Sequence, residues 1–547
     1  MTTLLFPGRH LLHTTFQMAY LRHVLTAPPA TLAFCRQPAT AAPITQVIFA
    51  ITSANQENAR YTPIPFYVRA IGVDRLAQQL LTPLGVSCRI LGIPHYAPTS
   101  RFVEIVLKEI EQQTEGNLVL TPQNCVALSS TTEVMAMFDR LGFAVLPAEH
   151  AHPAQPDTPM QLLQRVVEKG EQWGEDAGIR ADMAPTTYQL WCDFPDVPRR
   201  ILRLWRDPLL NDAGSLTDNR DYGSYAFLMG HSEIIALKYA DIRAAILPGK
   251  IVDEGCGDGA LLVPIAHDFP DSDLMGIEIT GEFIARARER QRAGEFGGTF
   301  VHFHQRNITH PLFHDAAIDT TICNATVHEL WSYGQQAETV HAYLALKYRQ
   351  TRMGGRLIIR DVVGPAEKDQ EVLLWLNDQD GSNENAFALL EDQAALQAHL
   401  ATLSTYARFR RFARDFLAEM RADGRREAAT AVVYYEEMIA GRRYARLSLR
   451  HAVEFMSKKD YVNNWDSEMN EEFAFWDFAA WKGALHAAGF RVVEDPNDPE
   501  RGSRVYTNLW IVRNRWEGKV ALFRRHSDGL QPLPFPPTNI VLVGEKQ

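Results

Sequence analysis

The sequence predicts an α/β protein built from two Rossmann-like domains, because strand-like runs alternate with helical patterns in two separate stretches of the chain. The first alternation covers residues 1–150, and the second begins at Gly249 and ends near Val363. Strands that alternate with helices are typical of a parallel sheet covered by helices. A chain of 547 residues is also too long for one hydrophobic core, so at least two domains are expected.

In the first stretch, four short apolar runs predict the strands of one parallel layer. These runs are Thr3–Phe6, Thr45–Ile51, Ser87–Ile93 and Val126–Ser129. A polar, proline-rich segment, HAHPAQPDTP at 150–159, follows them and is typical of a linker. We therefore expect a first domain over residues 1–150 and a linker with a helical bridge over 151–221.

The second domain is predicted over residues 222–547. A segment rich in Arg, Glu and Ala, at about 366–470, predicts a helical insertion that covers one end of the sheet. Its arginines are suited to clamp phosphate or carboxylate groups, although such arginines more often pair with neighbouring glutamates. Strand-like runs after residue 489 indicate that the sheet resumes there.

Composition and charge exclude several classes of protein. The net charge of −11 disfavours a broad basic surface that binds nucleic acid, so a small-molecule substrate is expected. The six cysteines show no pairing or clustering with histidine at metal-ligand spacing, so we predict reduced thiols and no metal site. No signal-peptide pattern and no apolar run of about 18 residues occurs, which predicts a cytoplasmic protein without a membrane span.

The strongest motif is a strand that leads into a glycine-rich turn and then a helix. Ile251 and Val252 precede Asp253, and the turn that follows carries Gly255, Gly257 and Gly259. Glycine permits positive φ and close approach of backbone to a ligand, so a ligand fits between the end of the strand and the start of the helix. The spacing G-x-G-x-G differs from the G-x-G-x-x-G of dinucleotide sites.

This spacing after an acidic residue resembles motif I of class I S-adenosylmethionine (SAM) dependent methyltransferases. The resemblance implies that SAM is the cofactor and that Asp253 helps to orient its methionine ammonium group. Glu278, at the end of the next apolar run, matches the carboxylate that accepts the ribose hydroxyls. Asn307, followed by Ile308, stands where the family usually has an Asp that contacts the adenine amino group.

Two later segments extend the resemblance toward the substrate. Residues 318–325, which include Asn324, are similar to motif IV, a strand whose carboxyl end faces the methyl group. The Gly-Gly turn and buried strand at 353–361 are similar to a later motif of the same family. An aromatic segment that contains Tyr225 matches the region that folds over the cofactor in this family.

The candidates for chemistry come just after motif IV. His328 is the best candidate for a general base because imidazole titrates near neutral pH, and Glu329 stands beside it. The alternative is that His328 caps the following helix or lines the pocket without proton transfer. The resulting hypothesis is a methyltransferase acting on a small polar, phosphate- or nucleotide-bearing substrate. A non-catalytic SAM-binding scaffold is the other hypothesis for this half.

The first domain resembles, distantly, the nucleotidylyltransferase superfamily related to nicotinamide mononucleotide adenylyltransferases. The resemblance rests on Gly8-Arg9 with His10 and His13, on the segment 53–66, and on the Ser/Thr turn at 129–131. The second histidine of the family's His-x-Gly-His pair is missing, because Phe16 stands there. A bifunctional nucleotidyltransferase and methyltransferase is therefore an alternative, beside a domain that only recognises nucleotides or is purely structural.

Overall fold

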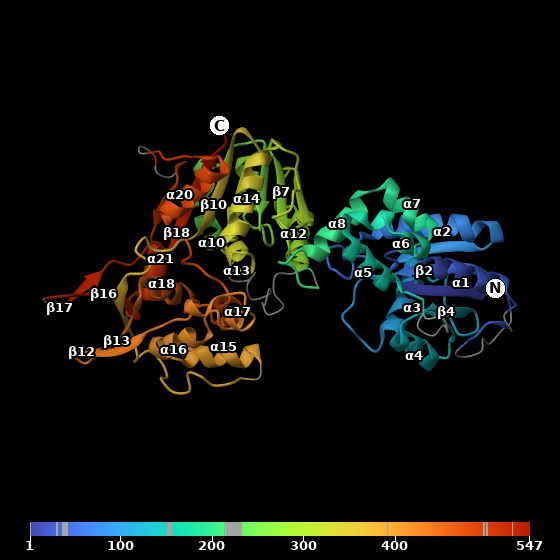
Figure 1. Ribbon diagram of the computed structural model, residues 1–547, viewed down its shortest axis with the longest axis horizontal. Coiled ribbons are helices and arrows are strands. Elements are labelled where there is room, and N and C mark those ends of the chain that lie inside the picture. The colour runs from blue at the N-terminus through green and yellow to red at the C-terminus, as the bar shows by residue number, and fades with distance from the viewer. Residues whose placement is uncertain are drawn as a thin grey trace. The chain divides into compact units, whose positions relative to one another are not determined.

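The computed structural model describes residues 2–28, 31–34, 42–149, 156–212, 214, 232–390, 392–495, 498, 501–527 and 529–547. The chain forms two compact units, Met1–Gly214 and Ser215–Gln547 (Figure 1). Within the described ranges, no helix has the length and apolar character needed to cross a membrane.

The first unit is built on a five-stranded parallel sheet of order β3-β2-β1-β4-β5. Its strands are β1 (Thr2–Gly8), β2 (Ile44–Ile51), β3 (Ser87–Gly92), β4 (Cys125–Ser129) and β5 (Ala144–Pro147). Leu4 and Phe6 of β1 pack into one apolar cluster and Leu5 packs into another, so β1 is covered on both faces, as expected for a central parallel strand. The helices between the strands are α1 (Thr15–Thr26), α2 (Phe66–Leu80), α3 (Phe102–Gln113) and α4 (Thr132–Arg140).

Four more helices belong to the first unit. They are α5 (Pro159–Lys169), α6 (Ala177–Asp182), α7 (Pro185–Asp193) and α8 (Asp196–Arg206). Trp173 and Trp191 pack there with Leu11, Leu12 and Ile64 in one buried cluster. The segment interpreted as a helical bridge thus buries its apolar faces against the loop after β1, and this burial anchors it to the first unit.

The second unit contains an eight-stranded sheet of order β14-β18-β10-β9-β6-β7-β8, with β15 also paired to β18. Its strands are β6 (Lys250–Glu254), β7 (Asp273–Glu278), β8 (Val301–Gln305), β9 (Ile318–Asn324), β10 (Thr351–Val362), β14 (Arg491–Val492), β15 (Arg504–Tyr506) and β18 (Asn539–Glu545). The strands β6 to β10 are parallel, whereas β18 is antiparallel to β10. Both units therefore have the predicted α/β, Rossmann-like architecture.

Helices connect and cover this sheet. They are α10 (Ser232–Ile242), α11 (Leu262–Asp268), α12 (Gly281–Arg292), α13 (Val327–Tyr333), α14 (Ala337–Gln350) and α20 (Phe478–Ala488). The helix α13 begins just after the carboxyl end of β9, which is the edge of a parallel sheet where ligands bind in folds of this kind. The sheet and α13 thereby position the candidate site.

The insertion after β10 is not purely helical, and this corrects the prediction for residues 366–470. It has the helices α15 (Gln393–Thr402), α16 (Thr405–Asp415), α17 (Ala418–Ala422), α18 (Leu449–Lys458) and α19 (Trp465–Met469). It also contributes β11, β12 and β13 to an antiparallel sheet of order β12-β13-β11-β16-β17, whose last two strands come from residues after β15. Those strands are β11 (Glu371–Leu376), β12 (Tyr435–Ile439), β13 (Arg442–Ser448), β16 (Val520–His526) and β17 (Gly529–Leu533).

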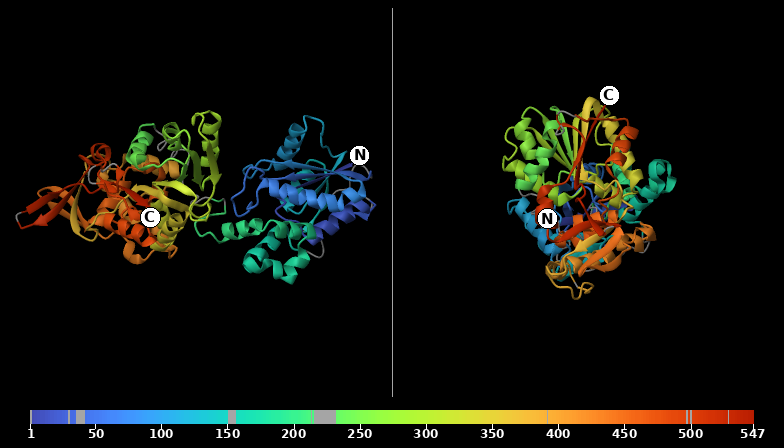
Figure 2. Two further views of the ribbon diagram at one scale, coloured as in Figure 1. Left: turned by 90° about the horizontal axis from the view of Figure 1, so that it is seen from above. Right: turned by 90° about the vertical axis from the view of Figure 1, so that its left-hand side faces the viewer.

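The short strands of the insertion are rich in charged residues, and the sequence analysis took this composition to indicate helices. Arg446 of β13 forms ion pairs with Glu437 of β12 and with Glu371 of β11, so these charges meet across strands and not along a helix face. The hairpin of β16 and β17 extends beyond the helices of the insertion (Figures 1 and 2). A cluster of aromatic side chains from Phe409, Phe412 and Phe455 fills the core between these helices and the sheet.

Candidate functional site

The glycine-rich turn after β6 has the geometry of a backbone that approaches a ligand. Gly255, Gly257 and Gly259 all have positive φ, of 73°, 53° and 78°. A Cβ on Gly255 would lie 2.2 Å from Thr326 Oγ1, and one on Gly259 would lie 2.8 Å from the Phe303 ring. No described atom lies within 4 Å of a Cβ on Gly257. Two of the glycines are therefore required by packing, and the middle one faces open space.

Asp253, just before this turn, carries a buried carboxylate oxygen that lacks a partner. The side chain is 1% exposed, and its Oδ2 has no hydrogen-bond partner among the described residues. Burial raises the pKa of this carboxyl to about 7. Nearby Lys238 of α10 has its pKa lowered to about 8, first by burial and then by the charge of Arg360. An unsatisfied buried carboxylate fits a cationic ligand such as the methionine ammonium group of SAM.

Glu278 lies at the carboxyl end of β7 and contacts the same turn. Its Oε2 accepts a hydrogen bond from the Gly257 N–H at 3.1 Å, and its Oε1 accepts from the N–H groups of Ile279 and Thr280 at 2.8 Å each. Burial raises the pKa of Glu278, backbone donors oppose this shift, and the negative charge of Glu329 adds to it. The carboxylate is thus fixed beside the open space at Gly257.

The other predicted cofactor residues are dispersed around this edge of the sheet. Asn307 is buried, and its Oδ1 accepts hydrogen bonds from the backbone N–H and the hydroxyl of Thr309, both at 2.9 Å. Ile308 is also buried. Asn324 ends β9, with its Oδ1 at 3.5 Å from Arg360 Nη1. Tyr225 lies outside the described residues.

His328 is held between two carboxylates from different parts of the chain. Asp361 of β10 accepts hydrogen bonds from the N–H groups of Val327 and His328, and so caps α13. Its Oδ1 lies 2.6 Å from His328 Nδ1, and Glu471 Oε2 lies 3.4 Å from His328 Nε2. Burial alone lowers the pKa of His328, but the charges and hydrogen bonds of Asp361 and Glu471 outweigh it and raise the pKa well above the usual value.

Glu329 and Glu471 complete a cluster around His328. One ligand-type atom of each of these three residues lies within 4.8 Å of the others. Glu471 is almost fully buried, and its Oε1 accepts a hydrogen bond from the Tyr333 hydroxyl at 3.2 Å. Thr326, which directly precedes α13, packs against Gly255, so the cluster and the glycine-rich turn lie at the same edge of the sheet.

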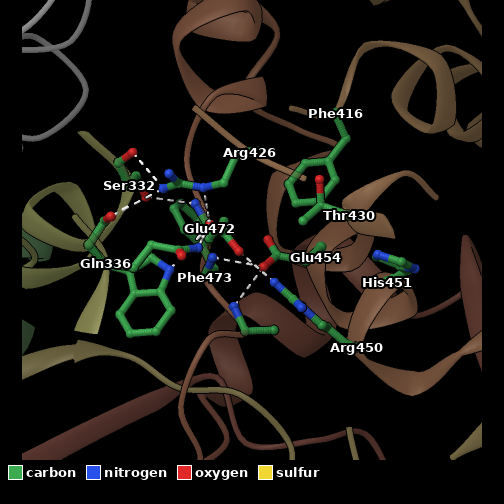
Figure 3. Close-up of polar contacts among 12 residues, drawn as sticks. Ser332, Gln336, Phe416, Arg426, Thr430, Arg450, His451, Glu454, Glu472 and Phe473 are labelled. Atoms are coloured by element: carbon green, nitrogen blue, oxygen red, sulfur yellow. Dashed lines mark hydrogen bonds and ion pairs between the residues drawn. The ribbon is translucent and has the colours of Figure 1, made fainter. Parts of the chain in front are cut away.

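The neighbouring residue Glu472 fixes this segment against α13 (Figure 3). Arg426 Nε lies 2.8 Å from Glu472 Oε1, and Arg450 Nη2 lies 2.5 Å from Oε2. The backbone N–H of Glu472 donates to the Ser332 hydroxyl at 2.8 Å. Burial opposes ionisation of Glu472, but the two arginines outweigh it and lower its pKa. This ionised network sets the position of Glu471.

A second buried ion pair supports the same segment. Glu454 of α18 accepts hydrogen bonds from the backbone N–H groups of Phe473 and Ala474, at 2.9 and 2.7 Å. Its other oxygen pairs with Lys458 Nζ at 2.8 Å. The insertion therefore delivers Glu471 to the site on a backbone that is fixed from two sides.

The sequence analysis predicted that Asp253, Glu278 and His328 belong to this site. It missed Glu471 and the hydrogen bond between Asp361 and His328. Asp361 ends a parallel strand next to β9, and that position was a usable signal. Glu471 follows His328 by more than 140 residues, so no local pattern connects the two.

The family comparison identifies the domain that carries this site. Residues 249–408 match a family model described as a methyltransferase domain. No curated protein matches the sequence. The second unit therefore contains a SAM-dependent methyltransferase domain, with SAM as its cofactor.

Similar solved structures include three bacterial and archaeal proteins. YcgJ of Bacillus subtilis is 13% identical, with 58% of this chain and 99% of that chain covered and a TM-score of 0.28. A SAM-dependent methyltransferase of Methanosarcina mazei is 14% identical, with 56% and 96% covered and a TM-score of 0.27. A SAM-dependent methyltransferase of Clostridium acetobutylicum is 11% identical, with 60% and 99% covered and a TM-score of 0.28.

Proposed function

We propose that the second unit transfers the methyl group of SAM to a small polar acceptor bound beside His328, Glu329 and Glu471. The observation that carries this proposal is the convergence of these three side chains within 4.8 Å at the carboxyl end of the sheet. The packing of Thr326, at the start of α13, against Gly255 of the glycine-rich turn supports a position next to the cofactor. A phosphate- or nucleotide-bearing acceptor is our proposed class.

In this proposal the cofactor is held by groups along the strand ends. Asp253 pairs with the methionine ammonium group, and Glu278 accepts the ribose hydroxyls. Asn307 and Ile308 border the adenine, whereas Asn324 lies on the side of the methyl group. Tyr225 stays a predicted cover over the cofactor.

Methyl transfer is an in-line displacement, so the residues mainly align the reactants and accept one proton. A lone pair of the acceptor forms the new bond to the methyl carbon while the carbon–sulfur bond breaks and S-adenosylhomocysteine leaves. His328 holds its protons between Asp361 and Glu471, which opposes its use as a base. We therefore assign the proton acceptor to Glu329 and a positioning role to His328.

Calorimetric titration with S-adenosylhomocysteine tests the cofactor assignment. Wild type should bind with micromolar affinity, and Glu278→Ala should lose this binding because the ribose hydroxyls lose their acceptor. Absence of binding by wild type would contradict the assignment.

Transfer of labelled methyl groups from SAM to a metabolite extract tests turnover. Glu329→Gln should bind S-adenosylhomocysteine normally but lose most turnover, while Glu338→Gln, an exposed carboxylate in the first turn of α14, serves as the matched control. Cofactor binding without turnover on any extract would favour a SAM-binding scaffold. Equal turnover in Glu329→Gln would refute the role of that residue.

For the first unit, we propose recognition of a nucleotide or nucleotide-like ligand as a second function. His10 Nδ1 lies 3.3 Å from His13 Nε2 just after β1, and His13 Nδ1 is buried without a hydrogen-bond partner in the described part of the chain. Burial lowers the pKa of His10 to about 4 and of His13 to about 3. Neutral imidazoles donate hydrogen bonds but bring no charge to a phosphate, which favours binding over nucleotidyl transfer.

Assays with the four nucleoside triphosphates distinguish these possibilities. Binding that is weakened in His13→Ala, without release of pyrophosphate, supports recognition alone. Pyrophosphate release that depends on His13 would instead support the bifunctional alternative, and no binding of any triphosphate would remove both.

A further inference from the structure

We propose that His328, Glu329 and Glu471 bind a divalent first-row transition metal ion next to the cofactor site. The three residues offer one imidazole nitrogen and two carboxylate oxygens, all within 4.8 Å of one another. Mixed nitrogen and oxygen ligands of this kind suit Mn²⁺, Fe²⁺ and Zn²⁺. The proposal deepens the proposed function and rests on it for the position of the ion beside the methyl acceptor.

The spacing of two of the ligand atoms fits one ion. His328 Nε2 and Glu471 Oε2 are 3.4 Å apart. Metal–ligand bonds of about 2.0–2.1 Å that meet at a tetrahedral angle place two ligand atoms about 3.4 Å apart. An ion could therefore replace the shared proton between these atoms with little movement of either side chain.

Residues outside the cluster orient the ligands as in known metal sites. Asp361 Oδ1 lies 2.6 Å from the other ring nitrogen of His328, which leaves Nε2 directed toward Glu471. Carboxylates that hold the distal nitrogen of a metal-bound histidine are a general feature of such sites. The Tyr333 hydroxyl supports Glu471 in the same way, at 3.2 Å.

The cluster concentrates carboxylates around one imidazole, and such a set of side chains suits a cation. Three carboxylates, those of Glu329, Asp361 and Glu471, surround one imidazole. Arg426 and Arg450 pair with Glu472, whereas Lys458 pairs with Glu454 and also donates to the backbone carbonyl of Glu471. Buried carboxylates are stabilised by an ion pair or a metal ion.

Such an ion indicates the chemical class of the acceptor. Three protein ligands leave coordination positions for an oxygen of the substrate, as in catalytic metal sites. A hydroxyl bound there has a lowered pKa, and Glu329 can take its proton on the carboxylate oxygen that does not bind the ion. The hydroxyl oxygen then forms the bond to the methyl carbon, and S-adenosylhomocysteine leaves. We therefore infer an oxygen acceptor, such as a hydroxy acid or a vicinal diol.

The test is metal binding by the full-length chain after treatment with a chelator. Calorimetry with Mn²⁺ and Zn²⁺ should show one site, and Glu471→Gln should weaken it by at least about 100-fold, because loss of a ligand costs no less than loss of a residue that only orients a ligand. Glu468→Gln, a buried carboxylate three residues earlier, is the matched control and should bind normally. Pulsed electron paramagnetic resonance of bound Mn²⁺ should detect coupling to a histidine nitrogen. This measurement tests the site on the wild-type protein alone and needs no variant.

The outcomes separate this proposal from the proposed function. Titration with S-adenosylhomocysteine, repeated on every variant, reports whether the cofactor site is folded. Failure of wild type to bind either metal while it still binds S-adenosylhomocysteine would overturn the metal site alone. Equal metal affinity in Glu471→Gln and wild type, or no histidine coupling, would overturn it as well. Failure of wild type to bind S-adenosylhomocysteine would instead count against the proposed function.

Discussion

The affinity for S-adenosylhomocysteine should rise with pH because of Asp253. Burial raises the pKa of this carboxyl to about 7, so it is mostly protonated below neutral pH in the empty site. The ligand ammonium group favours the ionised form. Binding below pH 7 must therefore expel a proton, and affinity should increase as pH rises toward 7 and then level off.

The size of the effect follows from that pKa. One unit of pH corresponds to a factor of ten, or about 1.4 kcal/mol, when a single proton is released. At pH 5, two units below the pKa, binding should be weaker than at pH 8 by about 100-fold, or about 2.7 kcal/mol.

Calorimetry between pH 5 and pH 8 measures this dependence, and buffers with different ionisation enthalpies count the released proton. Asp253→Asn is the control, because the amide keeps the shape of the side chain and cannot titrate. Its affinity should be low and nearly independent of pH over the same range. A flat profile for wild type, or an equal slope in Asp253→Asn, would refute the reasoning.

Two predictions concern stability of the second unit. Gly259→Ala should destabilise it by about 1–3 kcal/mol, because the new Cβ would lie 2.8 Å from Phe303 at a φ of 78°. Urea unfolding should show a smaller loss for Gly294→Ala, which has the same φ without a close atom; equal losses would argue against the clash. Lys347→Met should cost about 3–5 kcal/mol, because the buried Glu254 carboxylate loses its cationic partner at 2.5 Å and keeps only the hydrogen bond from the Tyr343 hydroxyl. The double variant Lys347→Met and Glu254→Leu should recover much of the loss in thermal unfolding, and no recovery would contradict the pairing.

The sequence was sufficient for the parts of the fold whose signals are local. The strand, glycine turn and helix at 251–268, and Glu278 at the end of the next strand, lie within about 30 residues of one another. Parallel strands bring their carboxyl ends to one edge, so the meeting of this turn with the region of His328 follows from strand order.

The remainder depended on contacts between distant segments. Glu471 reaches His328 because ion pairs of Glu454 and Glu472 fix its segment, and no periodic pattern encodes that arrangement. The arginine-rich strand β13 has the composition of a helix, and its pairing with β11 is visible only in three dimensions. The helices α5 to α8 follow a linker-like segment. Their packing against Leu11 and Leu12 could therefore not be predicted from the sequence pattern.

The position of β18 has a consequence for biosynthesis. This strand, at residues 539–545, lies between β14 and β10, although β10 is made nearly 180 residues earlier. While the chain emerges from the ribosome, the outer edge of β10 therefore has open hydrogen-bonding groups and apolar side chains until residues 539–545 follow. Exposed strand edges of this kind promote association with other chains, so we expect the nascent protein to need a chaperone during this interval.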